Sequence, residues 1–255
     1  MNSNILTEWI NPIYLNQEYI NNLRETIKSK PEIKYLTLDH FFIEDKINSM
    51  IEDHKKLSFS EKLDRYSHNG DILPYDSSLY WMNNLNVGYE LLFSNIWFKY
   101  LLNFFSKKNI DGYYTEVKIR KHRENSNGFW IHTDSKRRKI VFICYYNRNW
   151  TVEDGGLLQL WRVDECNCEK TIKVEHNCNN KMDYLNNVRL NVSSPGGGFS
   201  GNFSDENSHD LVLIDQILPL YNRIFLCDLS ANETYHSVTP TKMKERNGFV
   251  QWIYS

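Results

Sequence analysis

The stretch that decides the fold is WIHTDSKRRKIVFICYYNRNW, from Trp130 to Trp150. It places His132 and Asp134 two residues apart, directly before an apolar run. Residues i and i+2 of a β-strand point to the same face, so the imidazole and the carboxylate should project together while Thr133 points away. The stretch therefore predicts two metal-competent side chains on one face of a strand.

A third ligand would have to come from a distant part of the chain, and the best candidate is His236 in NETYHSVTP. Two histidines and a carboxylate form the facial triad of non-haem Fe(II) enzymes, which leaves positions open for substrate and oxygen. Arg246 follows ten residues later, and its guanidinium suits a bidentate grip on a carboxylate. Taken alone, the His-x-Asp pair also fits a hydrogen-bonded surface pair, and Arg246 fits a salt bridge at a strand end.

The composition limits the class of protein. Of the 255 residues, 41% are hydrophobic and 14% aromatic, enough for a sizeable core. A net charge of −2 argues against nucleic-acid and anionic membrane partners, so we expect a small-molecule or peptide substrate. Because the start lacks a secretory signal and no apolar run is long enough to span a bilayer, we expect a cytoplasmic protein. The five cysteines fit reduced thiols.

Residues 1–110 read as a mostly helical support. The run KYLTLDHFF, at 34–42, predicts a strand. Helices are predicted from apolar spacing and capping signals over four segments, namely 19–27, 43–51, a short one opened by the capping box Ser58-x-x-Glu61, and about 87–107.

Residues 111–255 change to the period-two rhythm of strands. Helices followed by many strands predict one domain, 1–255, mainly β, with a barrel or sandwich buttressed by N-terminal helices. Residues 164–210 are polar and weakly patterned, so they read as a long insertion and a binding lid. The period-two pattern begins at 116–120, and strand-like runs follow at 139–146, 157–163, 211–218, 223–229, 235–238 and 249–254.

Six short blocks then occur in a specific order: HTD, YYNRNW, DGGLLQLW, ILPLYNRIFL, YHSVTP and RNGFVQWIY. In this order the chain from about residue 113 to 255 resembles the Fe(II)- and 2-oxoglutarate-dependent dioxygenases, in their prolyl-hydroxylase-like branch. The resemblance implies a double-stranded β-helix core, a jelly-roll of the cupin-like kind. It implies iron held by His132, Asp134 and His236, and the distal carboxylate of 2-oxoglutarate held by Arg246 and Tyr145.

The resemblance also implies a reaction. Such an enzyme uses O2 to hydroxylate an unactivated C–H bond, here expected on an amino-acid side chain, prolyl or other, in a peptide or protein or as a free amino acid. Succinate and CO2 would be released. Two positions depart from the family pattern: His122 stands where this branch often has a tyrosine, and Gly248 stands where other branches have a small hydroxyl residue.

Other interpretations stay open. The same His/Asp/His site could hold zinc in a hydrolase, or the chain could be a non-catalytic cupin-like binding module. The basic run KRRK, at 136–139, reads as a solvated turn or as an attractor of an anionic substrate. Trp161 and Trp252 are predicted to lie in the barrel core. Four soft ligands in the insertion could bind a structural zinc, although reduced loop thiols are the simpler reading: Cys166, Cys168, His176 and Cys178.

Overall fold

The structure, a computed structural model, describes residues 4–57, 75–79, 91–107, 114–126, 128–134, 137–163, 211–231 and 234–254. The predicted short helix after Ser58, the insertion at 164–210 and its four soft ligands lie outside these ranges. The helices are α1 (Asn4–Trp9), α2 (Gln17–Ser29), α3 (Glu44–Lys55) and α4 (Asn95–Phe104). The strands are β1 (Lys34–Leu38), β2 (Tyr75–Leu79), β3 (Tyr114–His122), β4 (Phe129–Thr133), β5 (Arg138–Tyr145), β6 (Leu158–Val163), β7 (Leu211–Ile217), β8 (Arg223–Asp228), β9 (Tyr235–Val238) and β10 (Arg246–Tyr254).

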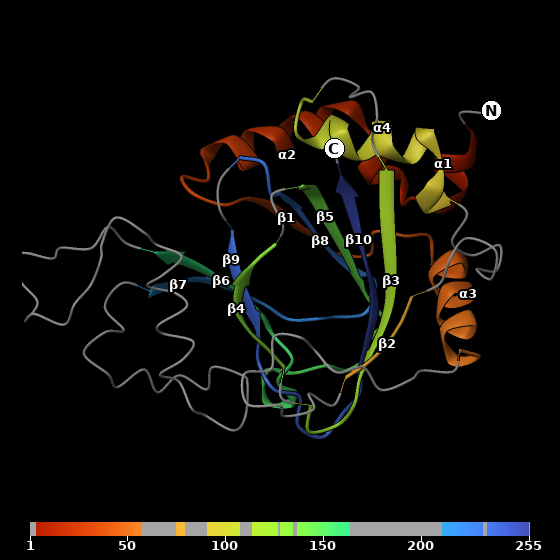
Figure 1. Cartoon of the computed structure of the whole chain (residues 1–255). Helices are drawn as coiled ribbons and strands as arrows, with labels where there is room; N and C mark the ends of the chain where they lie inside the picture. The colour runs from red at the N-terminus through yellow and green to blue at the C-terminus, as the bar shows by residue number, and fades with distance from the viewer. Residues whose placement is uncertain are drawn as a thin grey trace, which may run out of the picture.

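These strands form two antiparallel sheets. The large sheet has the order β1-β8-β5-β10-β3-β2, and the small sheet has the order β4-β9-β6-β7. Along the chain from β3 to β6, and again from β7 to β10, successive strands alternate between the two sheets, which is the winding of a jelly-roll. In Figure 1 the small sheet lies to the left of the large sheet and α3 to its right. The predicted mainly-β core with supporting helices is confirmed.

Each face of the large sheet buries a different core. In β3, Val117 and Ile119 are buried against the helices, whereas Lys118 and Arg120 face the other way, as strand alternation requires. The helical side is joined to α4 by a buried hydrogen bond, in which Trp97 Nε1 donates to Gln251 Oε1 at 2.8 Å. The second core fills the space between the sheets and includes Val141, Tyr145, Leu158, Leu160, Val238 and Trp252. Tyr145 and Trp252, which are discussed below, face this inter-sheet space.

The N-terminal elements largely follow their predictions. Helices α2 and α3 and strand β1 form where the spacing predicts them. The helix predicted over 87–107 is shorter, because Ser94 caps its N-terminus and accepts a hydrogen bond from Trp97 N at 3.2 Å. Strand β2, in a region read as helical, pairs with the edge of β3 and was not predicted, because YDSSL lacks an apolar alternation.

Several smaller predictions are also tested. Trp161 and Trp252 are buried, as predicted. Cys144 and Cys227, the two cysteines that the structure describes, are buried free thiols, as expected for a reduced protein. No helix within the described ranges combines the length and apolar character that a membrane crossing needs.

Candidate active site

The two predicted histidine ligands are brought together by the pairing of β4 with β9. His132 and His236 are direct partners in this antiparallel ladder. Directly opposed residues share a face and have their Cβ atoms about 4.5 to 5.5 Å apart. Asp134 follows one residue after β4 ends at Thr133. The backbone therefore gathers all three positions at one end of the small sheet; for His132 the structure describes this backbone position and not the side chain.

His236 is held in a defined tautomer. Its Nδ1 lies 3.2 Å from the carbonyl oxygen of Thr234. A carbonyl only accepts, so Nδ1 carries a proton, and Nε2 is the nitrogen that the neutral imidazole offers to a metal. Metal-bound imidazoles are oriented in this way by a carbonyl or carboxylate behind the ring. The half-buried His236 is therefore suited to coordinate a metal through Nε2.

Asp134 is turned into the space between the sheets. Its side chain is 6% exposed, Oδ1 forms an ion pair with Arg138 Nη1, and Oδ2 accepts a hydrogen bond of 3.0 Å from Trp252 Nε1. Trp252 belongs to the opposite sheet, so this bond crosses the inter-sheet space. Arg138 thus departs from the solvated turn predicted for KRRK, because it pairs with a buried acid, whereas Arg137 is exposed as predicted.

The described side chains do not complete a metal site by themselves. Among them, no group of three or more His, Cys, Asp or Glu converges as metal ligands would. The His132 side chain lies outside that set. The donor set of two imidazoles and one carboxylate, at positions that the register gathers, nevertheless fits the ligand preference of Fe(II).

The predicted cosubstrate residues lie where two paired strands of the large sheet meet: Arg246 is the first residue of β10 and Tyr145 is the last residue of β5. Arg246 is 7% exposed, and its Cζ lies 5.0 Å from the ring centroid of Tyr145. Arg246 is the direct partner of His122 in the ladder between β10 and β3, and Arg246 Nη1 lies 3.3 Å from His122 Nε2. Burial, followed by the charges of Arg246 and Arg120, holds the pKa of His122 well below 6.5. His122 is therefore a neutral acceptor beside the guanidinium.

Arg246 Nε has no hydrogen-bond partner among the described residues, and the Tyr145 hydroxyl, which lies beside the Arg246 guanidinium, makes no well-aligned hydrogen bond there. Nor does any carboxylate of the described residues form an ion pair with Arg246. Buried polar groups are normally hydrogen-bonded, and a buried guanidinium without an anion is costly. Burial raises the pKa of Tyr145, although Arg246 opposes the shift, so the hydroxyl keeps its proton and can donate. Both groups are suited to the carboxylate of a ligand.

Two glycines make this arrangement possible. A Cβ at Gly156 would lie 2.8 Å from Arg246 Cδ, so the glycine of DGG leaves room for the guanidinium arm. A Cβ at Gly248 would lie 2.3 Å from the carbonyl oxygen of Cys144, which leaves no space for the hydroxyl residue of other branches. Asn147 Oδ1 accepts a hydrogen bond of 2.7 Å from Asn247 N, directly after Arg246. Sequence analysis missed these supporting roles, because only the spatial approach of distant segments reveals them.

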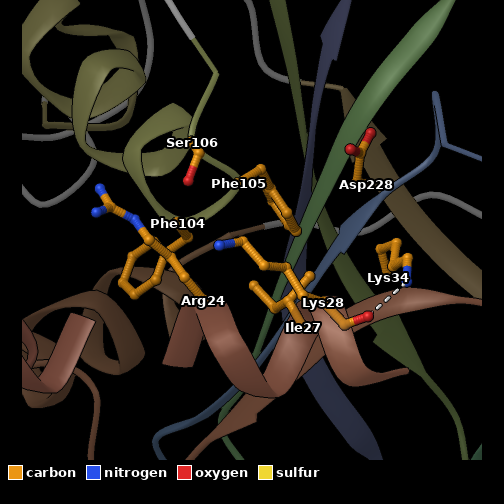
Figure 2. A pocket seen from close by; sticks show the side chains of 8 residues that line it. All are labelled: Arg24, Ile27, Lys28, Lys34, Phe104, Phe105, Ser106 and Asp228. Atoms are coloured by element: carbon orange, nitrogen blue, oxygen red, sulfur yellow. Dashed lines mark hydrogen bonds between the residues drawn. The ribbon is translucent and has the colours of Figure 1, made fainter. Parts of the chain in front are cut away.

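A cavity of about 260 Å³ lies elsewhere, between α2, the end of α4 and the end of β8 at Asp228 (Figure 2). Tyr145 pairs with Arg223, at the opposite end of β8. The basic side chains of the cavity already have partners: Arg24 Nε donates to Asn103 O at 2.7 Å, Lys34 Nζ donates to Lys28 O at 3.1 Å, and Lys28 Nζ pairs with Glu25 at 2.7 Å. They brace the helices, and we assign no ligand to this cavity.

Comparisons with known proteins agree with the geometry. A sequence comparison with curated proteins gives no match. Among solved structures, a prolyl-4-hydroxylase from Pseudomonas putida has a TM-score of 0.55 and 11% identity, covering 92% of this chain and 99% of its own. A prolyl hydroxylase from Trichoplax adhaerens, in complex with a hypoxia inducible factor peptide fragment, has a TM-score of 0.52 and 14% identity, covering 95% and 92%.

A third structure, HygX from Streptomyces hygroscopicus with nickel, 2-oxoglutarate and hygromycin B bound, has a TM-score of 0.53 and 8% identity, covering 91% of this chain and 86% of its own. At these identities the three structures establish the fold. The family model described as the 2OG-Fe(II) oxygenase superfamily matches residues 110–254, more than half of the chain. The resemblance carried by the six sequence blocks is thus confirmed. The chain belongs to the 2OG-Fe(II) oxygenase superfamily and is a dioxygenase that depends on Fe(II), 2-oxoglutarate and O2.

Proposed function

We propose that this dioxygenase hydroxylates an unactivated C–H bond of an amino-acid side chain, free or within a peptide. The observation that carries the proposal is the buried Arg246, which has no carboxylate partner among the described residues and lies beside the Tyr145 hydroxyl. A site of that kind suits a dicarboxylate cosubstrate. The paired positions of His132 and His236 supply the other half of the argument.

In this proposal His132, Asp134 and His236 hold the iron. His236 would coordinate through Nε2, because Nδ1 faces the Thr234 carbonyl. Trp252 and Arg138 orient the Asp134 carboxylate from the other side. When bound, the iron supplies the oxidation chemistry, in which substrate, 2-oxoglutarate and O2 give hydroxylated substrate, succinate and CO2.

Arg246 and Tyr145 would hold the distal carboxylate of 2-oxoglutarate. Each charge-assisted hydrogen bond to that group contributes about 1.5 to 3 kcal/mol, enough to select a dicarboxylate over a monoacid. His122 keeps Arg246 in place as a neutral acceptor and adds no further positive charge. This role fits the position at which the family's prolyl-hydroxylase-like branch often has a tyrosine.

The type of substrate is suggested by the names of similar proteins. Two of the structural neighbours are prolyl hydroxylases, and one of these has a peptide fragment bound. HygX, in contrast, has hygromycin B bound. All three are distant in sequence. Because two of the three are prolyl hydroxylases, a prolyl side chain is the first substrate to test.

The two competing interpretations predict different products. A zinc hydrolase would need no 2-oxoglutarate, and a binding module would release no product. Membership of the oxygenase superfamily favours a dioxygenase over both. Formation of succinate separates the three, because only a dioxygenase converts 2-oxoglutarate to it.

The test is to incubate the purified chain with Fe(II), 2-oxoglutarate, O2 and a panel of amino acids and prolyl peptides. Succinate and a mass gain of one oxygen on one panel member are expected. Arg246→Gln should raise the KM for 2-oxoglutarate about tenfold or more. Arg148→Gln is the matched control, because Arg148 is 56% exposed and pairs with Glu44 at the surface. Absence of succinate under all conditions, or an unchanged KM in Arg246→Gln, would contradict the proposal.

A further inference from the structure

The turn that carries the two glycines of DGG is closed by a buried acid. Asp154 is the first residue of DGG, and its side chain is 4% exposed. Its Oδ2 accepts hydrogen bonds of 2.8 Å from Thr151 N and of 2.8 Å from Lys244 Nζ. Lys244 Nζ also donates to Asn149 O at 2.8 Å. One lysine therefore ties the start of this turn to its end, and we call Asp154 and Lys244 the turn pair.

Backbone hydrogen bonds attach the same turn to the segment that leads into β10. Lys242 N donates to Asp154 O at 2.9 Å, and Gly156 N donates to Pro240 O at 3.0 Å. These bonds join two parts of the chain that are far apart in sequence. They fix the DGG turn against the backbone that immediately precedes Arg246.

The DGG turn also lies against the side chain of Arg246. A Cβ at Gly156 would lie 2.8 Å from Arg246 Cδ and 3.2 Å from Trp150 Cζ2, so the Gly156 backbone is in direct contact with the guanidinium arm. Trp150 is itself fixed to the turn, because its Nε1 donates to Gly155 O at 2.9 Å. A shift of the turn would therefore give the arm of Arg246 access to other rotamers.

We propose that Asp154 and Lys244 are positioning residues for 2-oxoglutarate: through the DGG turn they hold Arg246 in the conformation that meets the distal carboxylate. The inference rests on the proposed function, which assigns that carboxylate to Arg246. A side chain that is fixed before binding loses less conformational entropy when the ligand arrives. The hydrogen bond from Lys244 lowers the pKa of Asp154, although burial opposes the shift, so the ion pair persists at neutral pH.

The test measures the Kd of 2-oxoglutarate by titration calorimetry on the full chain, loaded with Fe(II) under anaerobic conditions. Lys244→Met keeps the length of the side chain and removes its charge and its donors. We expect the Kd to rise about tenfold, which corresponds to the rotamer freedom that Arg246 would regain. Asp154→Asn should give a similar rise. Lys244→Arg, which keeps the charge and the donors, should keep most of the affinity.

Two further readouts separate positioning from a general loss of stability. If the turn pair acts as a unit, the double variant Asp154→Asn/Lys244→Met should weaken binding no more than either single variant does. In air, the KM for 2-oxoglutarate in succinate formation should rise in Lys244→Met, while kcat changes by less than about twofold. This split is expected because Arg246 is assigned to the end of the cosubstrate that does not react.

A second ion pair offers the matched control. Lys107 pairs with Asp228 at 2.6 Å, and their side chains are 21% and 9% exposed. Asp228 lies at the end of β8 opposite to Arg223, which pairs with Tyr145, so this pair is remote from the cosubstrate residues. Lys107→Met should lower the Tm and leave the Kd of 2-oxoglutarate unchanged.

The results that would overturn the proposal are specific. They are an unchanged Kd in Lys244→Met, an equal rise in Lys107→Met, or additive effects in the double variant. Lys244→Met decides the matter even where Asp154→Asn fails to fold, because the Lys244 side chain is 43% exposed.

Failure of the proposed function has a different signature. An unchanged Kd in Arg246→Gln would refute the assignment of Arg246, and with it the route through which the turn pair acts. Weaker binding in Arg246→Gln together with an unchanged Kd in Lys244→Met would refute the positioning role alone.

Discussion

Replacing Tyr145 by phenylalanine should make the protein without cosubstrate more stable and make it bind 2-oxoglutarate more weakly. Tyr145 is 1% exposed, and its hydroxyl, which lies beside the Arg246 guanidinium, makes no well-aligned hydrogen bond with the described residues. The substitution removes this one oxygen and keeps the ring that packs in the inter-sheet core. Opposite effects on stability and binding are expected of a group reserved for a ligand.

The magnitudes follow from the state of the hydroxyl. A buried hydroxyl without a partner costs about 1 to 3 kcal/mol. Its removal should therefore stabilise the protein by about 1 kcal/mol or more, which raises the Tm by about 2 to 4 °C for a chain of this size. The lost hydrogen bond to a carboxylate is worth about 1.5 to 3 kcal/mol. The Kd of 2-oxoglutarate should rise roughly ten- to a hundredfold.

Two measurements check this prediction. Scanning calorimetry of the protein without cosubstrate gives the change in Tm, and titration calorimetry of the anaerobic Fe(II) form gives the Kd of 2-oxoglutarate. The matched control is Tyr35→Phe, because Tyr35 lies in the same core but its hydroxyl donates to Asp215. That variant should lose stability and keep its affinity for 2-oxoglutarate. A destabilised Tyr145→Phe protein with unchanged affinity would refute the reasoning.

Three further predictions test the rest of the site. His236→Ala should lower the Fe(II) content measured by mass spectrometry roughly tenfold or more, whereas His40→Ala should retain iron; equal iron content would contradict the ligand assignment. Gly156→Ala should raise the KM for 2-oxoglutarate about tenfold, because the new Cβ meets Arg246 Cδ and the φ of +65° disfavours a side chain; an unchanged KM would argue against this packing. The free energy of unfolding in urea should fall less with acidification for His122→Gln than for the unsubstituted protein. The folded pKa of His122 is depressed, so its stabilising contribution is complete above pH 6.5 and is lost as the pH falls below that value. The loss amounts to up to about 1.4 kcal/mol per pH unit. Identical pH dependence in the two proteins would contradict the buried, neutral histidine.

Local patterns in the sequence were enough to predict the elements and the types of residue at the site. Strand alternation assigned opposite faces to Val117 and Lys118, and helical spacing located α2 and α3. Residue chemistry singled out His132, Asp134 and Arg246, because few side chains suit iron or a dicarboxylate. These features depend on residues that are close together in the sequence, so a periodic pattern is enough to predict them.

The tertiary structure decided what these residues contact. The pairing of His132 with His236 depends on the register between two distant strands. The inward turn of Arg138 and the outward turn of Arg137 depend on a buried carboxylate that the run KRRK does not reveal. A sequence pattern fixes which face of a strand a side chain occupies, whereas burial and pairing across the sheets fix its partners, and those partners determine its charge and its chemistry.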